Sequence, residues 1–219
     1  MDIALPLALA AGYLLGSMPF GFLVARAHGV NIFEVGSRNP GATNVRRVLG
    51  AKAGNLVFVL DALKGAAATA LPWALEAAGL LDRVEPAAAQ SWLPAAVAGL
   101  VGALLGHSFS CFTRFRGGKG VATAAGGFLV LMPVATLVSA VVWILSFLAF
   151  RYVSLASLLS AAALPFAAWG LQRPPLVITL ATLVALFVII RHRTNISRLL
   201  AGTEARFQRP KTDPASPPS

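Results

Sequence analysis

Residues 106–123, which read GHSFSCFTRFRGGKGVAT, join two hydrophobic runs through a short basic loop. The loop carries Gly117, Gly118 and Gly120, with Lys119 between the last two. Glycines let backbone amides approach an oxyanion, the apolar run that follows supplies a helix N-terminus, and the lysine adds a full positive charge. The stretch therefore predicts a phosphate site, although basic loops between membrane spans also serve as topology signals.

The composition around this loop is that of an integral membrane protein. Hydrophobic residues make up 57% of the 219 residues, charged residues only 12%, and the mean hydropathy is +0.75. A soluble domain carries about a quarter charged residues. The net charge of +10 does not predict nucleic-acid binding, because the lysines and arginines lie in short connectors between apolar runs rather than on one basic arm.

The hydropathy pattern predicts an all-α, polytopic membrane bundle of about seven transmembrane helices. Residues 121–132 are too few to cross a hydrocarbon core of about 30 Å, so this segment is expected to be tilted, buried among neighbours or re-entrant. We expect a single membrane domain over residues 1–202 and a disordered tail over 203–219. The expected spans are residues 3–27, 53–75, 92–112, 121–132, 134–150, 153–171 and 176–190.

The distribution of basic residues predicts the topology. The connector 28–52 and the segment 191–200 are rich in arginine and lysine, which places both in the cytoplasm, with the N-terminus outside and the C-terminus inside. Within the second span, Asp61 and Lys64 are three residues apart and share a helix face. Charges at that depth are costly unless they are paired, so we expect an inward-facing ion pair.

The connector 28–52 holds a second polar cluster in residues 36–47, GSRNPGATNVRR. Hydroxyl and amide groups there can donate to oxyanions, and an arginine can hold a phosphate with two parallel hydrogen bonds. The same residue types are also common in turns and helix caps.

A third cluster lies in residues 191–200, RHRTNISRLL, where His192, Asn195 and Arg198 recur at a spacing of three. A basic segment that contacts anionic lipid has the same composition. The three clusters are predicted to meet at one side of the bilayer, where they form a site for phosphorylated substrates.

Five ordered motifs across residues 16–199 resemble a known family. They read GSxPFG, SxNxGATNxxR, DxxKG, GHxFxxFxxFxGGKGVAT and HRxNIxRL. This set resembles the bacterial acyl-phosphate-dependent glycerol-3-phosphate acyltransferases, the PlsY family. Arg116 departs from the pattern, since lysine is common there in the family.

The resemblance implies transfer of a fatty acyl group from acyl phosphate to the 1-hydroxyl of glycerol 3-phosphate. The products are lysophosphatidic acid and inorganic phosphate, in the first step of phospholipid synthesis. It implies direct transfer without a covalent intermediate, a metal or a cofactor, in a multi-pass protein of the bacterial inner membrane whose site faces the cytoplasm. The lipid bilayer is then the protein's other partner.

The resemblance also assigns site residues. Those expected to be catalytic are Lys119, Arg47, His192, Asn195 and Ser37, and those expected to bind substrate are Thr43, Asn44, Gly117, Gly118 and Gly120. His107, which the sequence places beside the basic glycine loop, is also expected to bind substrate. The proton acceptor stays open between His107, His192 and the substrate's own phosphate, because neither histidine has an evident carboxylate partner in the sequence.

Two other functions fit parts of the pattern. A transporter of an organic phosphate also uses broken helices and a basic cavity, but it predicts repeated halves, and the sequence shows no internal repeat. A lipid-binding assembly factor without catalysis would tolerate the loss of Lys119.

Overall fold

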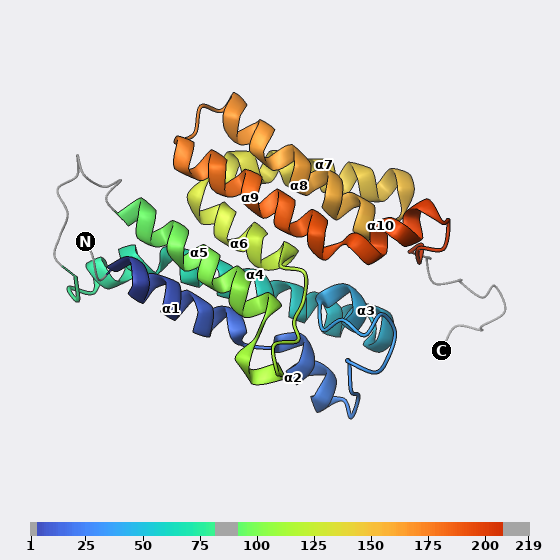
Figure 1. The fold of residues 1–219 in the computed structure, drawn as a ribbon. Helices are drawn as coiled ribbons and strands as arrows, with labels where there is room; N and C mark the ends of the chain where they lie inside the picture. Colours follow the sequence, from blue (N-terminus) through green and yellow to red (C-terminus); the bar gives the residue numbers. More distant parts are fainter. Residues whose placement is uncertain (1–3, 82–91, 208–219) are drawn as a thin grey trace, which may run out of the picture.

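The fold is seen in a computed structural model that describes residues 4–81 and 92–207, and every regular element within those residues is a helix (Figure 1). This confirms the predicted all-α class. The elements in chain order are α1 (Ala4–Ser17), α2 (Phe20–Ala27), α3 (Ala42–Leu49), α4 (Ala51–Ala77), α5 (Leu93–Ser108), the 3₁₀ turn η2 (Cys111–Thr113), α6 (Val121–Leu131), α7 (Pro133–Phe150), α8 (Val153–Gly170), α9 (Pro175–Arg191) and α10 (Arg193–Leu200).

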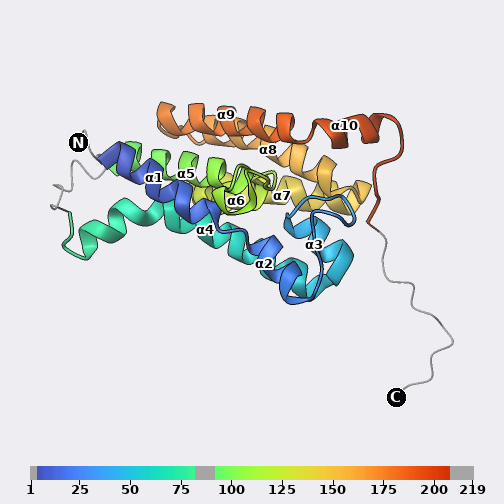
Figure 2. The same cartoon turned by 60° about the horizontal axis from the view of Figure 1, so that its bottom comes forward.

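The long helices pack as two groups that share one core. In the first group, α5 packs on α1 and α4, α1 also contacts α4, and α6 packs on α4 and α5. In the second group, α8 packs on α7 and α9, and contacts of α6 with α7 and α9 join the two groups (Figures 1 and 2). The core contains fully buried Leu100 of α5, Phe128 of α6 and Ala181 of α9. The helices that carry polar clusters are therefore held by one continuous apolar interior.

Within the described residues, five segments are long and apolar enough to cross a membrane. The pair α9 and α10 adds a sixth candidate span, bent by 60° at His192. The seventh expected span is α6, whose 11 residues cover only about half of a hydrocarbon core. All seven expected hydrophobic segments are thus helical, but α6 is packed among its neighbours rather than long enough to span alone.

Small residues let the helices of the first group approach closely. A Cβ at Gly126 of α6 would overlap the carbonyl oxygen of Ala62 on α4, and one at Gly16 of α1 would overlap the backbone of Ala103 on α5. Pro19 lies in the short break that separates α1 from α2. The small residues in this part of the first span therefore serve both a break and a close helix contact.

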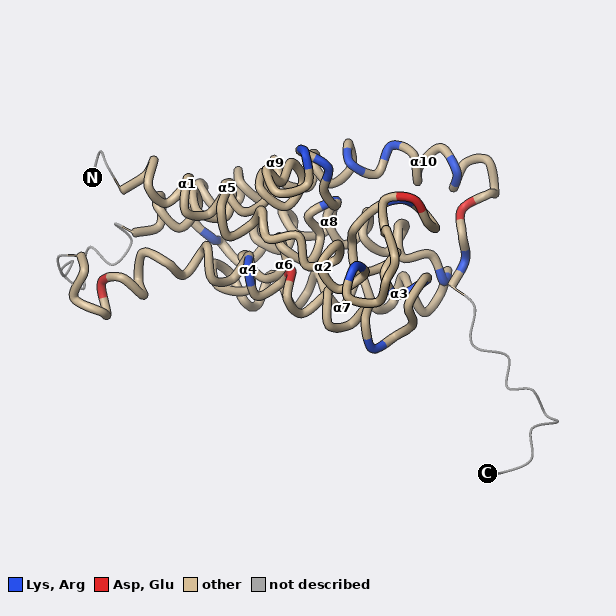
Figure 3. Tube along the Cα trace, turned by 90° about the horizontal axis from the view of Figure 1, so that it is seen from below, with Lys and Arg blue, Asp and Glu red and all other residues tan. Residues whose placement is uncertain are grey.

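The helices α2, α3 and α10 gather at one end of the bundle, where most of the lysines and arginines lie (Figures 2 and 3). A second apolar cluster that includes Ile32, Val45 and Val57 fixes the connector and α3 against α4. Residues 203–207, which we expected in a disordered tail, pack against the bundle: the Phe207 amide donates to the Arg151 carbonyl at 2.8 Å. Residues 208–219 lie outside the described part of the chain.

Gly126→Ala tests the close contact of α4 and α6. The added methyl group has to push the α4 backbone away, and overpacking of this kind costs about 1–3 kcal/mol of the free energy of unfolding. We expect a lower apparent melting temperature for the detergent-solubilised protein. Gly170→Ala in α8 is the matched control, since a Cβ there meets nothing within 4 Å. Equal melting temperatures for the two variants would contradict the close packing.

Candidate active site

The three polar clusters meet at the end of the bundle that carries α2, α3 and α10. They enclose a cavity of about 170 Å³ between the connector, the glycine loop and the bent α9–α10 pair. The convergence expected from the sequence is therefore present in the fold. The residues that line the cavity are Ser37, Asn39, Lys119, Arg191, Arg193, Thr194, Asn195 and Arg198.

Lys119 is tied to α10 by a short hydrogen bond. Its Nζ donates to Asn195 Oδ1 at 2.6 Å, and Asn195 Nδ2 in turn donates to Glu204 Oε1 at 2.6 Å. Glu204 also accepts from Ser154 Oγ at 2.7 Å and from Arg198 Nε at 2.7 Å. By accepting a hydrogen bond from Asn195 Nδ2, the Glu204 carboxylate fixes the orientation of the amide. The amide oxygen, Asn195 Oδ1, therefore faces Lys119.

The position of Lys119 changes its protonation. Burial lowers the pKa of Lys119 from 10.5 to about 8; attraction by Glu204 opposes this shift, whereas repulsion from Arg198, Arg191 and Arg47 adds to it. For Glu204 itself, burial acts to raise the pKa, but the hydrogen bonds from Asn195, Ser154 and Arg198 outweigh it and lower the pKa below its ordinary value. At neutral pH an ammonium and a carboxylate therefore face the same amide from opposite sides.

The glycine loop is held by its backbone. The Arg191 guanidinium donates to the carbonyls of Gly117 at 3.3 Å and Gly118 at 2.8 Å, and the Gly118 amide donates to the His107 carbonyl at 3.1 Å. A Cβ at Gly118 would overlap the His107 ring, and Gly120 adopts φ +82°, which favours glycine. These glycines are required for close packing and for a left-handed turn directly before α6.

The connector presents Ser37 to the cavity through Asn44. The buried Asn44 side chain accepts from the Ser37 amide at 2.8 Å and donates to the Val35 carbonyl at 3.1 Å. Thr43 and Arg47 lie on the exposed side of α3. Neither lines the cavity, although Arg47 is close enough for its charge to act on Lys119.

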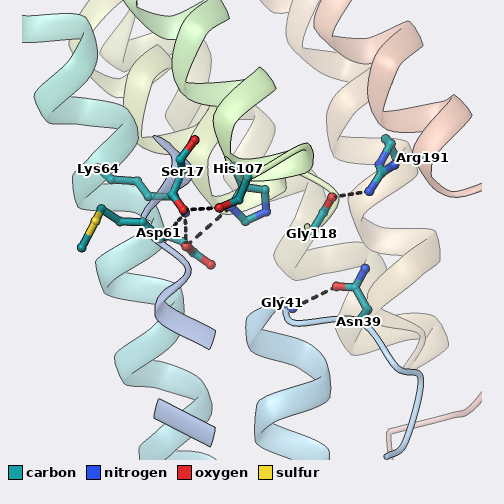
Figure 4. A network of polar contacts seen from close by, with 10 residues as sticks. Ser17, Asn39, Gly41, Asp61, Lys64, His107, Gly118 and Arg191 are labelled. Carbon is teal, nitrogen blue, oxygen red and sulfur yellow. Dashed lines mark hydrogen bonds and ion pairs between the residues drawn. The ribbon is translucent and has the colours of Figure 1, made fainter. Parts of the chain in front are cut away.

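The two histidines of the predicted site lie in different places. His192 is buried at the bend between α9 and α10, where Nδ1 is 2.8 Å from the Val188 carbonyl. Because a carbonyl only accepts, Nδ1 carries the proton and Nε2 is left as an acceptor. His107 lies on the other side of Gly118 from Arg191 (Figure 4). It lines a separate small cavity of about 20 Å³.

His107 has a carboxylate partner that sequence spacing did not reveal. Asp61 Oδ1 is 3.5 Å from His107 Nδ1 and 2.7 Å from Lys64 Nζ, and Lys64 also donates to the Met18 carbonyl at 2.9 Å. The side chains of Asp61, Lys64 and His107 are buried, and Figure 4 shows them pointing toward one another. The predicted inward-facing pair of Asp61 and Lys64 is confirmed, and it extends to the histidine that packs under the loop.

Among the predicted site residues, the structure brings Ser37, Lys119 and Asn195 to the cavity wall. Sequence reasoning missed Glu204 and the loop contacts of Arg191. Glu204 was assigned to a disordered tail, and the available signal was a lone carboxylate directly after a basic segment. Arg191 was placed in the third polar cluster but given no partner, since no spacing rule links it to carbonyls more than 70 residues away.

Lys119→Met tests the burial of the ammonium. In the unfolded chain a lysine keeps a pKa near 10.5, whereas in the fold the pKa is about 8, so holding the charge costs stability below pH 8 and costs nothing above about 10.5. We expect the variant to melt at a higher temperature than the parent at pH 7, with a difference that shrinks as the pH rises from 8 toward 10.5.

The control is the same substitution at the exposed Lys52, which reports the effect of removing a surface lysine. A Lys119→Met protein that melts below the parent by the same margin at every pH would show that the bond to Asn195 outweighs the cost of burial.

Comparisons with known proteins point to one family. The family profile described as "Glycerol-3-phosphate acyltransferase" matches residues 6–202. A glycerol-3-phosphate acyltransferase of Trichlorobacter lovleyi is 42% identical over 200 residues, 91% of this chain and 96% of that protein. One of Mesorhizobium japonicum is 44% identical over 208 residues, 94% of this chain and 98% of that protein.

Two solved structures are similar over most of the chain. The crystal structure of PlsY (YgiH), an integral membrane glycerol 3-phosphate acyltransferase, in its glycerol 3-phosphate form is 39% identical with a TM-score of 0.82, covering 93% of this chain and 96% of that one. Its lysophosphatidic acid form has a TM-score of 0.80, covering 93% and 95%. The chain therefore belongs to the glycerol-3-phosphate acyltransferase family.

Proposed function

We propose that this protein transfers a fatty acyl group from acyl phosphate to the 1-hydroxyl of glycerol 3-phosphate, which yields lysophosphatidic acid and inorganic phosphate. The observation that carries the proposal is the charge of the cavity. Lys119, Arg191, Arg193 and Arg198 all line it, with no carboxylate among its described lining residues. Such a cavity suits substrates that each bring a phosphate group.

The chemistry needs little beyond placement and charge. An acyl phosphate is a mixed anhydride whose carbonyl is already activated, so the hydroxyl can attack it directly while the C–O bond to phosphate breaks. In our proposal, Lys119 and the glycine loop hold the leaving phosphate. The donor set of Ser37, Asn195 and the basic residues of α10 places glycerol 3-phosphate. No covalent acyl-enzyme forms.

The remaining expected residues take supporting roles in the proposal. Asn44 holds the segment that presents Ser37, and Thr43 and Arg47 meet the substrate at the open side of the cavity. The hydroxyl proton has two acceptors that fit: His192 Nε2, which is left without a proton, and the phosphate of the substrate itself.

The proposal includes a location. The basic residues at the α2, α3 and α10 end favour the cytoplasmic side of the membrane, where glycerol 3-phosphate is dissolved. In the proposal, the acyl chain of acyl phosphate stays in the bilayer beside the apolar helices, and its phosphate reaches the membrane surface. The two substrates therefore meet at that surface. This corresponds to the inner membrane of a bacterial cell, with the N-terminus outside and the C-terminus cytoplasmic.

Phosphate release tests the reaction and the role of Lys119 together. Purified protein in detergent is given palmitoyl phosphate with and without glycerol 3-phosphate. We expect release that requires glycerol 3-phosphate and equals the lysophosphatidic acid formed. Lys119→Ala should lower kcat/KM at least ~100-fold, the scale of losing one preorganised donor, in a protein that still folds.

If the folded parent protein releases no inorganic phosphate, the proposed reaction is wrong and transport of an organic phosphate becomes the favoured function. Near-normal turnover by Lys119→Ala would remove that residue from the mechanism while leaving the reaction in place.

The protonation of Lys119 sets an upper pH limit for activity. The charged form is lost as the pH rises through about 8. A phosphate monoester has its second pKa near 6, so the substrate stays a dianion over this range. We expect kcat/KM to fall about tenfold per pH unit above 8. A profile that stays flat about a unit or more beyond pH 8 would show that the ammonium charge is not needed.

A further inference from the structure

Gly117 and Gly118 are held from two sides by groups outside the loop. On one side, the Arg191 guanidinium donates hydrogen bonds to both carbonyls, at 3.3 Å for Gly117 and 2.8 Å for Gly118. On the other side, the His107 carbonyl accepts a hydrogen bond from the Gly118 amide at 3.1 Å. The His107 ring occupies the space that a Cβ of Gly118 would need. Figure 4 shows Gly118 between these two residues. The backbone directly before Lys119 therefore has little freedom.

Arg191 reaches the loop because of the bend in the last span. It is the final residue of α9, and the chain turns by 60° at His192 before α10 begins. Asn195 lies on α10 just beyond the bend and binds Lys119 Nζ. The bend thus contacts the glycine loop at two points, the backbone through Arg191 and the side chain of Lys119 through Asn195.

The arginine is held in a way that stability alone does not explain. Its guanidinium lies over the Phe109 ring, 5.3 Å from the centroid, and its buried Nε has no hydrogen-bond partner among the described residues. Burial disfavours the charge, and an unpaired buried donor costs stability. Both contacts come from one guanidinium nitrogen, Nη2, whose two N–H bonds lie in a fixed plane. The N–H bonds of a lysine ammonium point in tetrahedral directions from a shorter side chain, so lysine does not reproduce this geometry.

We propose that Arg191 is a positioning residue for the acyl transfer: it holds the Gly117 and Gly118 carbonyls so that Lys119 projects into the cavity toward Asn195. This inference rests on the proposed function. In it, Arg191 acts through Lys119 and the loop rather than by binding substrate. A misplacement of about 1 Å at a reacting centre costs about 100-fold in rate, so the effect belongs in kcat.

The test compares Arg191→Lys and Arg191→Ala with the parent. We expect both variants to lower kcat about 100-fold. In Arg191→Lys the KM for glycerol 3-phosphate should change little, because lysine keeps the charge of the cavity but not the two carbonyl contacts. Millimolar guanidinium should restore part of kcat to Arg191→Ala, where it fills the space left by the side chain, and none to Arg191→Lys. Arg26→Ala, which removes an exposed arginine of α2, is the charge control and should behave as the parent.

A second readout does not depend on turnover. Hydrogen exchange, followed by mass spectrometry on the loop peptide, should be faster in both Arg191 variants than in the parent and in Arg26→Ala, since the loop loses an anchor. This measurement keeps its meaning even if the parent shows no acylation, an outcome that would overturn the proposed function instead. If Arg191→Ala does not fold, Arg191→Lys carries both readouts.

Three results would overturn the inference. Near-parent kcat in Arg191→Lys would show that charge alone matters. A raised KM with unchanged kcat would make Arg191 a substrate ligand. Unchanged exchange of the loop peptide in both variants would show that the loop does not depend on the arginine.

Discussion

The site depends on one constraint: an ammonium group has to be kept charged in a half-buried place at the polar end of an apolar bundle. Burial acts against the charge of Lys119, and the surrounding arginines add repulsion. The Asn195 oxygen compensates for part of this, and Glu204 fixes that oxygen by binding the other end of the same amide. A phosphate that enters the cavity offsets the remaining repulsion between Lys119 and the arginines. The protein therefore binds the anion more tightly than it would if these positive charges were already neutralised in the free protein.

This constraint explains why distant segments have to be placed so accurately. The loop packs on His107, its carbonyls bind Arg191, and the bend at His192 presents Asn195. Beneath the loop, the buried contacts between Asp61, Lys64 and His107 join α4 to α5. Close contacts at Gly126 and Gly16 hold the helices that carry these groups. The apolar packing and the polar site are therefore parts of one framework, in which small residues set the distances between charged ones.

Much of this arrangement was predictable from the sequence. Hydropathy predicted the helical segments, and the polar motifs identified Ser37, Lys119 and Asn195 as residues of one site. Contacts between residues that only the tertiary fold brings together were not predictable. Glu204 follows a basic helix in a polar segment, and only folding brings its carboxylate to Asn195. His107 and Asp61 lie on different spans, so no spacing rule pairs them.

A double-mutant cycle between Lys119 and Asn195 tests the central claim most directly. The parent, Lys119→Ala, Asn195→Ala and the double variant are compared by kcat/KM for glycerol 3-phosphate acylation. If the amide acts by holding the ammonium, the two losses are strongly non-additive, and the double variant is about as slow as the slower single variant. Losses that simply multiply would mean that the two groups act independently, which contradicts an account built on their contact.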